Sequence, residues 1–111
     1  MDSSTDNEVL RSAVDWLEHG AIVTLVTVAR TWGSAPRRPG ALMAIHADGR
    51  FVGSVSGGCV EDDLVQRSLR GEFELQPPTV IKYGVNTATT RRIGLPCGGR
   101  LQLVVESLDA A

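Results

Sequence analysis

The sequence predicts a mixed α/β fold, built as a single domain of about five strands and two helices that includes a β-hairpin. Three observations support this prediction. The chain has 111 residues, 42% of them are apolar, and the apolar residues switch between helical and strand-like spacing along the chain. A chain of this length and composition can close one hydrophobic core. We therefore expect residues 1–111 to form one domain.

The first predicted element is a helix that starts near Thr5 and ends before Gly20. Thr5 and Glu8 have the spacing of a capping box, with Thr5 as the N-cap. Gly20 can adopt the left-handed conformation that ends many helices. The apolar face predicted from the helical spacing consists of Leu10, Ala13, Val14 and Leu17.

Residues 21–29 follow as a strand that is rich in β-branched side chains and apolar on both faces, which is typical of a central strand. Residues 33–40 contain two prolines and two glycines and must form a loop. Residues 41–45 and 51–55 are expected to pair as a hairpin, because Asp48-Gly49 between them is a strong turn signal.

A second helix is predicted from about Cys59 to Arg70, ending at Gly71. Its apolar stripe consists of Val60, Leu64, Val65 and Leu69. Strands are expected at residues 79–83 and 101–106. Residues 84–100 between them read as an unusually long loop, and such loops are often functional.

Charge and composition exclude several classes of protein. The net charge of −2 argues against sequence-independent binding to nucleic acid. No apolar run is long enough to span a membrane, and the polar, acidic N-terminus lacks the features of a secretory signal. We therefore expect a cytoplasmic protein, in which Cys59 and Cys97 are not joined by a structural disulfide. The two cysteines and two histidines do not have the spacing of a zinc site.

Three segments combine flexible backbone with a charged or reactive side chain. They are Gly33-Ser34-Ala35-Pro36-Arg37, Ser56-Gly57-Gly58-Cys59-Val60-Glu61 and Gly94-Leu95-Pro96-Cys97-Gly98-Gly99. In the second segment, a strand leads through Ser-Gly-Gly into a helix, where free backbone N–H groups and the helix dipole favour an anion. Cys59 at this helix start would have a lowered thiol pKa. A tight turn with a small buried cysteine explains the same residues equally well.

The other candidate residues also allow two interpretations. Glu61 either complements the positive end of the helix or acts as an acid/base or ligand-binding group, and the first is the commoner case. Cys97 is either a reactive loop thiol or part of a plain turn. Arg37 is either a binder of phosphate or carboxylate, to which its planar guanidinium is suited, or an ordinary surface residue.

Taken together and in order, the strings GSAPRRPG, SGGCVE and GLPCGG resemble the N-terminal domain of the XdhC/CoxI family. The likeness spans roughly residues 9–106 and includes Tyr83-Gly84 before the third string. It implies a protein, itself not an enzyme, that transiently binds the molybdenum cofactor (molybdopterin) and helps to sulfurate and insert it. The residues that match the family's motifs are Gly33, Ser34, Ala35, Pro36, Arg37, Ser56, Gly57, Gly58, Cys59, Glu61, Cys97, Gly98 and Gly99.

The resemblance further implies two partners: a xanthine dehydrogenase or carbon monoxide dehydrogenase type apoenzyme, and a cysteine desulfurase. Cys59 and Cys97 would face the molybdenum or relay sulfur, since thiolates suit soft metals. Two alternatives stay open at this point. One is a small thiol-dependent sulfurtransferase or redox protein, and the other is a non-catalytic scaffold that bridges hydroxylase and desulfurase.

Many family members continue into a C-terminal Rossmann-type domain. Residues 1–111 hold no such domain, so the chain is expected to be either a fragment or a short family member that has only the first domain. An open sheet edge, if the fold has one, would favour a homodimer.

Overall fold

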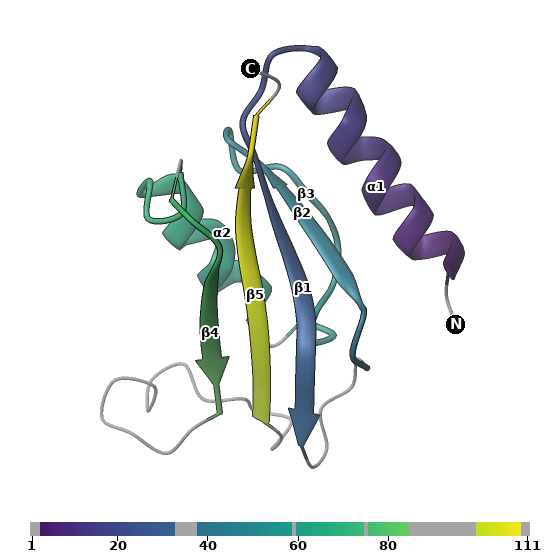
Figure 1. The fold of residues 1–111 in the computed structure, drawn as a ribbon, viewed down its shortest axis with the longest axis vertical. Helices are drawn as coiled ribbons and strands as arrows, with labels where there is room; N and C mark the ends of the chain where they lie inside the picture. Colours follow the sequence, from purple (N-terminus) through teal and green to yellow (C-terminus); the bar gives the residue numbers. More distant parts are fainter. Residues whose placement is uncertain (1–2, 33–37, 59, 75, 85–99, 110–111) are drawn as a thin grey trace.

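The structure, a computed structural model, describes residues 3–32, 38–58, 60–74, 76–84 and 100–109. These residues form two helices and five strands, and Figure 1 shows how they are arranged. In chain order they are α1 (Ser3–Glu18), β1 (Val23–Trp32), β2 (Leu42–His46), β3 (Phe51–Gly53), α2 (Glu61–Leu69), β4 (Thr79–Tyr83) and β5 (Arg100–Leu108).

The five strands form one antiparallel sheet in the order β3-β2-β1-β5-β4. This arrangement confirms the predicted mixed fold, the β2–β3 hairpin and the central place of the first strand. The observed strands are displaced slightly from the predicted ranges at residues 21–29, 41–45, 51–55 and 101–106, whereas residues 79–83 are a strand as predicted. Differences of this size are usual at element ends, where pairing depends on the neighbouring strand.

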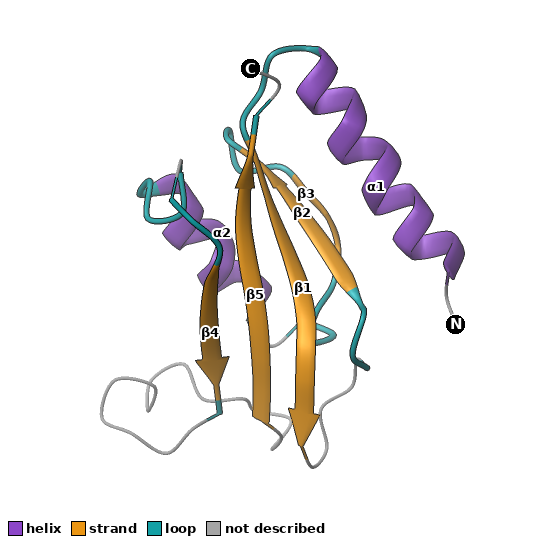
Figure 2. Cartoon of the chain, in the orientation of Figure 1, coloured by secondary structure: helices purple, strands orange, loops and turns teal. Residues whose placement is uncertain are grey.

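The two helices cover opposite faces of the sheet (Figure 2). Helix α1 contacts β2, β3 and part of β1, and its buried Val9 and Ala13 pack on Val23 and Ala44. Helix α2 lies over the other face, where the main core collects side chains from β1, β2, β4 and β5. Since α1 does not extend over β4 and β5, neither helix of the described residues covers the α1 side of these two strands. No helix in the described part of the chain is long and apolar enough to cross a membrane.

Two details of α1 differ from the prediction. The helix begins at Ser3, so Thr5 lies within its first turn and is not the N-cap. The buried face is centred on Val9 and Ala13, whereas Leu10 and Val14 are 44% and 52% exposed. Helical spacing allowed two neighbouring apolar stripes on this helix, and contact with the sheet selected the one that contains Val9.

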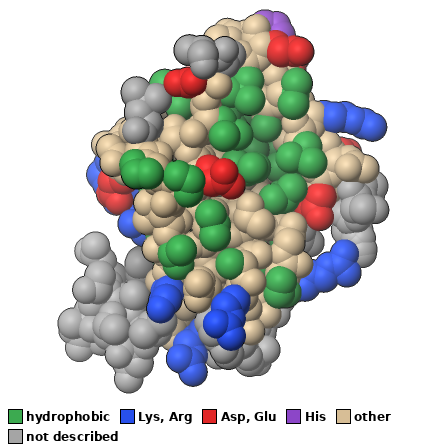
Figure 3. Space-filling model, viewed as in Figure 1, with side chains coloured by type: hydrophobic (Ala, Val, Ile, Leu, Met, Phe, Trp, Pro, Cys, Tyr) green, Lys and Arg blue, Asp and Glu red, His purple; other side chains and the backbone are tan. Residues whose placement is uncertain are grey.

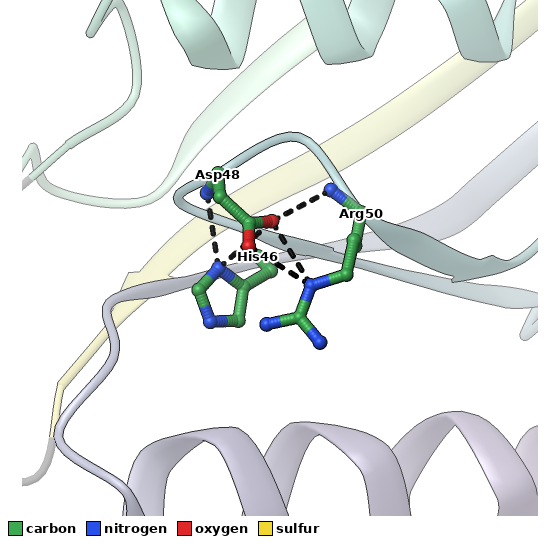
Figure 4. A network of polar contacts seen from close by, with 3 residues as sticks. All are labelled: His46, Asp48 and Arg50. Atoms are coloured by element: carbon green, nitrogen blue, oxygen red, sulfur yellow. Dashed lines mark hydrogen bonds and ion pairs between the residues drawn. The ribbon is translucent and has the colours of Figure 1, made fainter.

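The β2–β3 turn fixes α1 through a small polar network (Figure 4). The Nδ1 atom of His46 accepts the Asp48 N–H at 3.0 Å, and Arg50 Nε donates to Asp48 Oδ2 at 2.9 Å. The backbone N–H of Arg50 also donates to Asp48, which lowers the pKa of that carboxyl. The ring of Trp16 on α1 meets the His46 ring edge-on at 5.2 Å, and the Arg50 guanidinium lies 5.6 Å from the Trp16 ring. The turn therefore serves as the contact point for the C-terminal half of α1.

Helix α2 also starts later than predicted. It begins at Glu61 with Val60 as the N-cap, so Cys59 precedes the helix and does not fall in its first turn. Val60, Leu64 and Val65 are buried as expected, but Leu69 is 49% exposed. The helix ends as predicted near Gly71, which has a positive φ of 79°.

Gly53, at the end of β3, packs too closely for any side chain. Its φ is +84°, and a Cβ atom there would overlap the Leu42 carbonyl oxygen and meet Val9 Cγ2. We expect Gly53→Ala to lower the free energy of unfolding by about 2–4 kcal/mol, from backbone strain plus overpacking. Urea denaturation measures this change.

The matched control is Gly20→Ala. Gly20 has a similar φ of +86° but no atom within 4 Å of the added Cβ, so only the strain of about 1 kcal/mol applies. Equal losses for the two variants would contradict the proposed close contact at Gly53.

Candidate functional site

All five strands have one terminus at the same end of the sheet, which we call the motif end. Because neighbouring strands are antiparallel, the last residues of β1, β3 and β4 lie beside the first residues of β2 and β5. The register places Trp32 opposite Arg100 and Tyr83 opposite Leu101. At the β3 edge of the sheet, the Ser54 N–H donates to the Leu42 carbonyl at 3.2 Å. The segments that carry the first and third motifs therefore join the fold beside Trp32 and Arg100, at the lower end in Figure 1. The second motif follows β3, whose last residue, Gly53, pairs with Met43 opposite Val26, so this motif joins the sheet beside the middle of β1.

Much of the predicted site lies outside the described residues. The first motif (Gly33, Ser34, Ala35, Pro36 and Arg37), Cys59, and Cys97, Gly98 and Gly99 of the third motif all fall there. Among the residues that are described, no group of three His, Cys, Asp or Glu side chains could hold a metal ion. The geometry that can be built comes from residues 54–61 and from the strand ends.

The carboxylate of Glu61 organises the loop that precedes α2. Its Oε2 atom accepts hydrogen bonds from Ser54 Oγ at 2.7 Å and from the N–H groups of Val55 and Ser56, each at 2.9 Å. Its Oε1 atom accepts from Ser56 Oγ at 2.6 Å and from the Gly58 N–H at 3.0 Å. The Glu61 side chain, at the start of α2, thus joins Ser54, Val55, Ser56 and Gly58 of the loop through hydrogen bonds.

The two serine hydroxyls extend this network. Ser54 Oγ accepts the Gly57 N–H, and Ser56 Oγ accepts the Val60 N–H, both at 2.9 Å. Ser54 was not singled out by the sequence analysis, because it lies outside the recognised SGGCVE string and its role depends on the fold of the loop. Ser56 is fully buried and Glu61 is only 5% exposed.

These contacts keep Glu61 ionised. Burial alone would raise its pKa, but the hydrogen bonds from the Ser56 and Ser54 hydroxyls and from the Ser56 and Val55 N–H groups outweigh burial and lower the pKa of Glu61 to about 2. The helix start therefore already carries a negative charge. This charge takes the position in which an external anion or a thiolate would otherwise be stabilised.

The predicted anion site on the Ser-Gly-Gly backbone is accordingly filled from within the chain. The N–H groups of Ser56 and Gly58 donate to Glu61, and that of Gly57 donates to Ser54. An external anion could use the Ser56 and Gly58 donors only by displacing a buried carboxylate, and the Gly57 donor only by displacing the Ser54 hydroxyl. The local role of Ser56, Gly57, Gly58 and Glu61 is to shape the loop that carries Cys59, and of the two interpretations of Glu61, the geometry favours a charge at the helix start.

A second acidic residue of α2 holds the end of β4. The hydroxyl of Tyr83, which is fully buried, donates to Asp63 Oδ2 at 2.5 Å, and Arg67 Nη1 lies 3.4 Å from the same hydroxyl. Burial and the Asp63 carboxylate raise the pKa of Tyr83, so it stays a neutral donor. The first turn of α2 therefore holds two parts of the fold. Glu61 holds the loop 54–60, and Asp63 holds the end of β4.

Comparison with known proteins identifies the family. A sequence profile of the XdhC and CoxI family matches residues 16–84, which is more than half of the chain. The chain belongs to the XdhC/CoxI family. Residues 54–61 and the Tyr83-Gly84 pair both lie inside the matched region, so the hydrogen-bonded loop and the end of β4 are within the family's domain.

Two curated relatives extend the match. The chain is 38% identical over 103 residues to the molybdenum cofactor insertion chaperone PaoD of Escherichia coli, covering 93% of this chain and 32% of that protein. It is 45% identical over 82 residues to a probable xanthine dehydrogenase subunit of Bacillus subtilis, covering 74% of this chain and 24% of that protein. The chain therefore spans a third or less of the length of either relative.

A solved structure shows the same fold. A crystal structure of a xanthine dehydrogenase from Bacillus halodurans superposes with a TM-score of 0.69 at 28% identity. The match covers 95% of this chain and 31% of that one. The antiparallel sheet with a helix on each face is thus also found in a longer chain.

The buried charge of Glu61 predicts a pH-dependent stability. The pKa of Glu61 is about 2 in the folded chain, against 4.5 for the ordinary group. A lowered folded pKa stabilises the fold above the unfolded pKa, and this stabilisation is lost as the pH falls from about 4.5 towards 2. We expect Glu61→Gln to cost about 2–3 kcal/mol near pH 7 and progressively less at pH 3–4. Urea denaturation at several pH values measures the difference.

The control for this experiment is Glu74→Gln, because Glu74 is exposed. Its difference from wild type should stay within about 0.5 kcal/mol at every pH. A Glu61→Gln deficit that does not shrink with acid would show that the carboxylate charge is not what stabilises the loop.

Removal of the Tyr83 hydroxyl should loosen the end of β4 from α2. Tyr83→Phe loses a hydrogen bond to a charged acceptor, and we expect a cost of about 1–2 kcal/mol in thermal or urea unfolding. Thr79→Val on the same strand removes an exposed hydroxyl that donates to the Pro77 carbonyl. It should cost less than about 0.5 kcal/mol. Equal effects of the two variants would argue against the Tyr83–Asp63 link.

Proposed function

We propose that this chain is a maturation factor, and not an enzyme, which transiently binds the molybdenum cofactor and assists its sulfuration and insertion into a hydroxylase of the xanthine dehydrogenase or carbon monoxide dehydrogenase type. The observation that carries the proposal is that the three motif-bearing segments all adjoin strand termini that point towards the same end of the sheet. The names of two relatives support it, since one is a molybdenum cofactor insertion chaperone and the other belongs to a probable xanthine dehydrogenase.

In this proposal the loop 54–60 acts as a preformed support. The Glu61 hydrogen bonds fix the backbone on the N-terminal side of Cys59, and the Val60 N-cap fixes it on the other side. A support held by buried hydrogen bonds costs little entropy when a ligand binds. Cys59 and Cys97 are the groups proposed to contact the molybdenum or its sulfido ligand, because thiolate sulfur suits a soft metal centre.

The proposed partners are the apoenzyme that receives the cofactor and a cysteine desulfurase that supplies sulfur. The chain's role in the sulfur exchange is to hold the cofactor while the desulfurase acts on it. Among the described strands β4 lies at an edge of the sheet, which supports a homodimer as part of the same proposal.

Cofactor binding tests the proposal directly. The purified chain is mixed with isolated molybdenum cofactor, and bound cofactor is quantified after gel filtration by the fluorescence of the oxidised pterin. We expect the wild type to bind and Cys59→Ala to bind about tenfold more weakly, because a metal-facing thiolate is lost. Gln66→Ala, an exposed position on α2, is the control and should bind like wild type.

A well-folded wild type that does not bind the cofactor would refute the proposed function. Binding that is unchanged in Cys59→Ala would remove the thiol from the site and leave the rest of the proposal in place. Loss of binding in Gln66→Ala would point to a general disturbance of α2.

A further inference from the structure

A β-bulge at the motif end changes the direction of one arginine. Along β1, Val26 and Val28 point into the core beneath α2. Simple alternation would send Arg30 to that same face. The register shifts between Val28 and Arg30, however, so that Val28 pairs with Leu103 and Arg30 pairs with Gln102. Bulges of this kind commonly redirect a side chain near a functional site.

The bulge places Arg30 on the open face of the sheet. Leu101 and Leu103 of β5 are buried in the core beneath α2, so Gln102 between them points to the opposite face. Residues directly opposite each other on paired strands share a face. Arg30 therefore lies on the Gln102 side, which α1 leaves uncovered over β4 and β5.

Two further cations surround Gln102 on this face. Lys82 of β4 pairs directly with Gln102, and its neighbours Ile81 and Tyr83 are buried on the other side. Arg100 lies two residues before Gln102 on β5 and therefore points to the same face. Lys82, Arg30 and Arg100 are all exposed. Figure 3 shows Lys and Arg side chains gathered at the lower end of this face, where the strands meet the motif-bearing segments.

The chemistry of this cluster suits a phosphate ligand. Residues on neighbouring strands are about 5 Å apart when directly opposed and about 7–8 Å apart on the diagonal, so long basic side chains around Gln102 can converge on one anion. Arginine offers two parallel donors to phosphate oxygens, lysine offers a compact charge, and the Gln102 amide adds a neutral donor.

We propose that Arg30, Lys82 and Arg100, grouped around Gln102, bind the phosphate or pyrophosphate of the cofactor. This inference rests on the proposed function for the identity of the ligand, but the anion site itself does not depend on it. It replaces the Ser-Gly-Gly backbone, whose donors are used by Glu61 and Ser54, as the place for the cofactor's anionic end.

The first experiment uses inorganic pyrophosphate as the probe, with calorimetry at low ionic strength. We expect wild type to bind it, each of Arg30→Gln, Lys82→Gln and Arg100→Gln to bind about threefold to tenfold more weakly, and the triple variant to lose binding. Raised salt should weaken the wild-type interaction, because these charges are exposed. Arg11→Gln, an exposed arginine on α1, removes the same charge elsewhere and should have no effect.

The second experiment measures binding of the isolated molybdenum cofactor to wild type and to the triple variant, with thermal unfolding as the check on folding. A folded triple variant that binds either pyrophosphate or the cofactor like wild type overturns the proposal, as does a wild type that does not bind pyrophosphate. If pyrophosphate binds through the cluster but the cofactor does not bind at all, the anion site stands and the proposed function fails.

Inorganic phosphate serves as a third probe to separate two forms of the ligand. A wild-type preference for pyrophosphate over phosphate of about tenfold or more supports a cofactor with a dinucleotide-type phosphoanhydride. Equal affinity supports the phosphate monoester of the nucleotide-free pterin. Loss of either interaction in Arg11→Gln as well as in the triple variant would mean that binding follows net charge and would overturn the site.

Discussion

The carboxylate of Glu61 is the group on which the geometry of the motif end depends. A buried charge must be surrounded by donors, and here the donors come from residues 54–58, immediately before α2. The hydrogen-bond donors of the loop stabilise the Glu61 carboxylate, and the carboxylate in turn holds the loop in its conformation. Because Glu61 is also the first residue of α2, the position of the helix relative to the sheet and the shape of the loop are set together. Asp63, in the same turn of α2, accepts a hydrogen bond from the Tyr83 hydroxyl and so also fixes the end of β4.

Antiparallel pairing then determines which segments meet. In an antiparallel sheet of this order, the ends of β1, β3 and β4 and the starts of β2 and β5 all point towards the same end of the sheet. Segments far apart in the sequence are thereby attached to strand termini that point the same way. The opposite end of the sheet carries the β2–β3 turn, whose His46–Asp48–Arg50 network supports α1 and has no part in the motif end. Structural and candidate functional polar groups are thus separated along the strands.

The two helices cover the sheet unevenly, and this also affects where charged side chains lie. Helix α2 completes the main core on one face, whereas α1 on the other face reaches only as far as β1. On the face of β4 and β5 that α1 does not cover, the bulge after Val28 brings Arg30 opposite Gln102, which also pairs with Lys82 and lies two residues after Arg100. Negative charge is therefore concentrated at the start of α2, on one face, and positive charge on the other face at the same end. An elongated ligand with an anionic tail and a soft metal centre suits this polarity.

Local patterns in the sequence determined the elements of this protein. Asp48-Gly49 indicated the hairpin, Gly20 and Gly71 indicated the helix ends, and the apolar content of residues 21–29 indicated the central strand, because each of these signals depends only on neighbouring residues. The three motifs likewise identified the family before the fold was known. Only the tertiary structure decided which of two stripes on α1 is buried, that Glu61 fills its own loop, and that Arg30 crosses to the open face. These outcomes depend on strand register and on hydrogen bonds closed by folding, and periodicity along the chain carries no information about either.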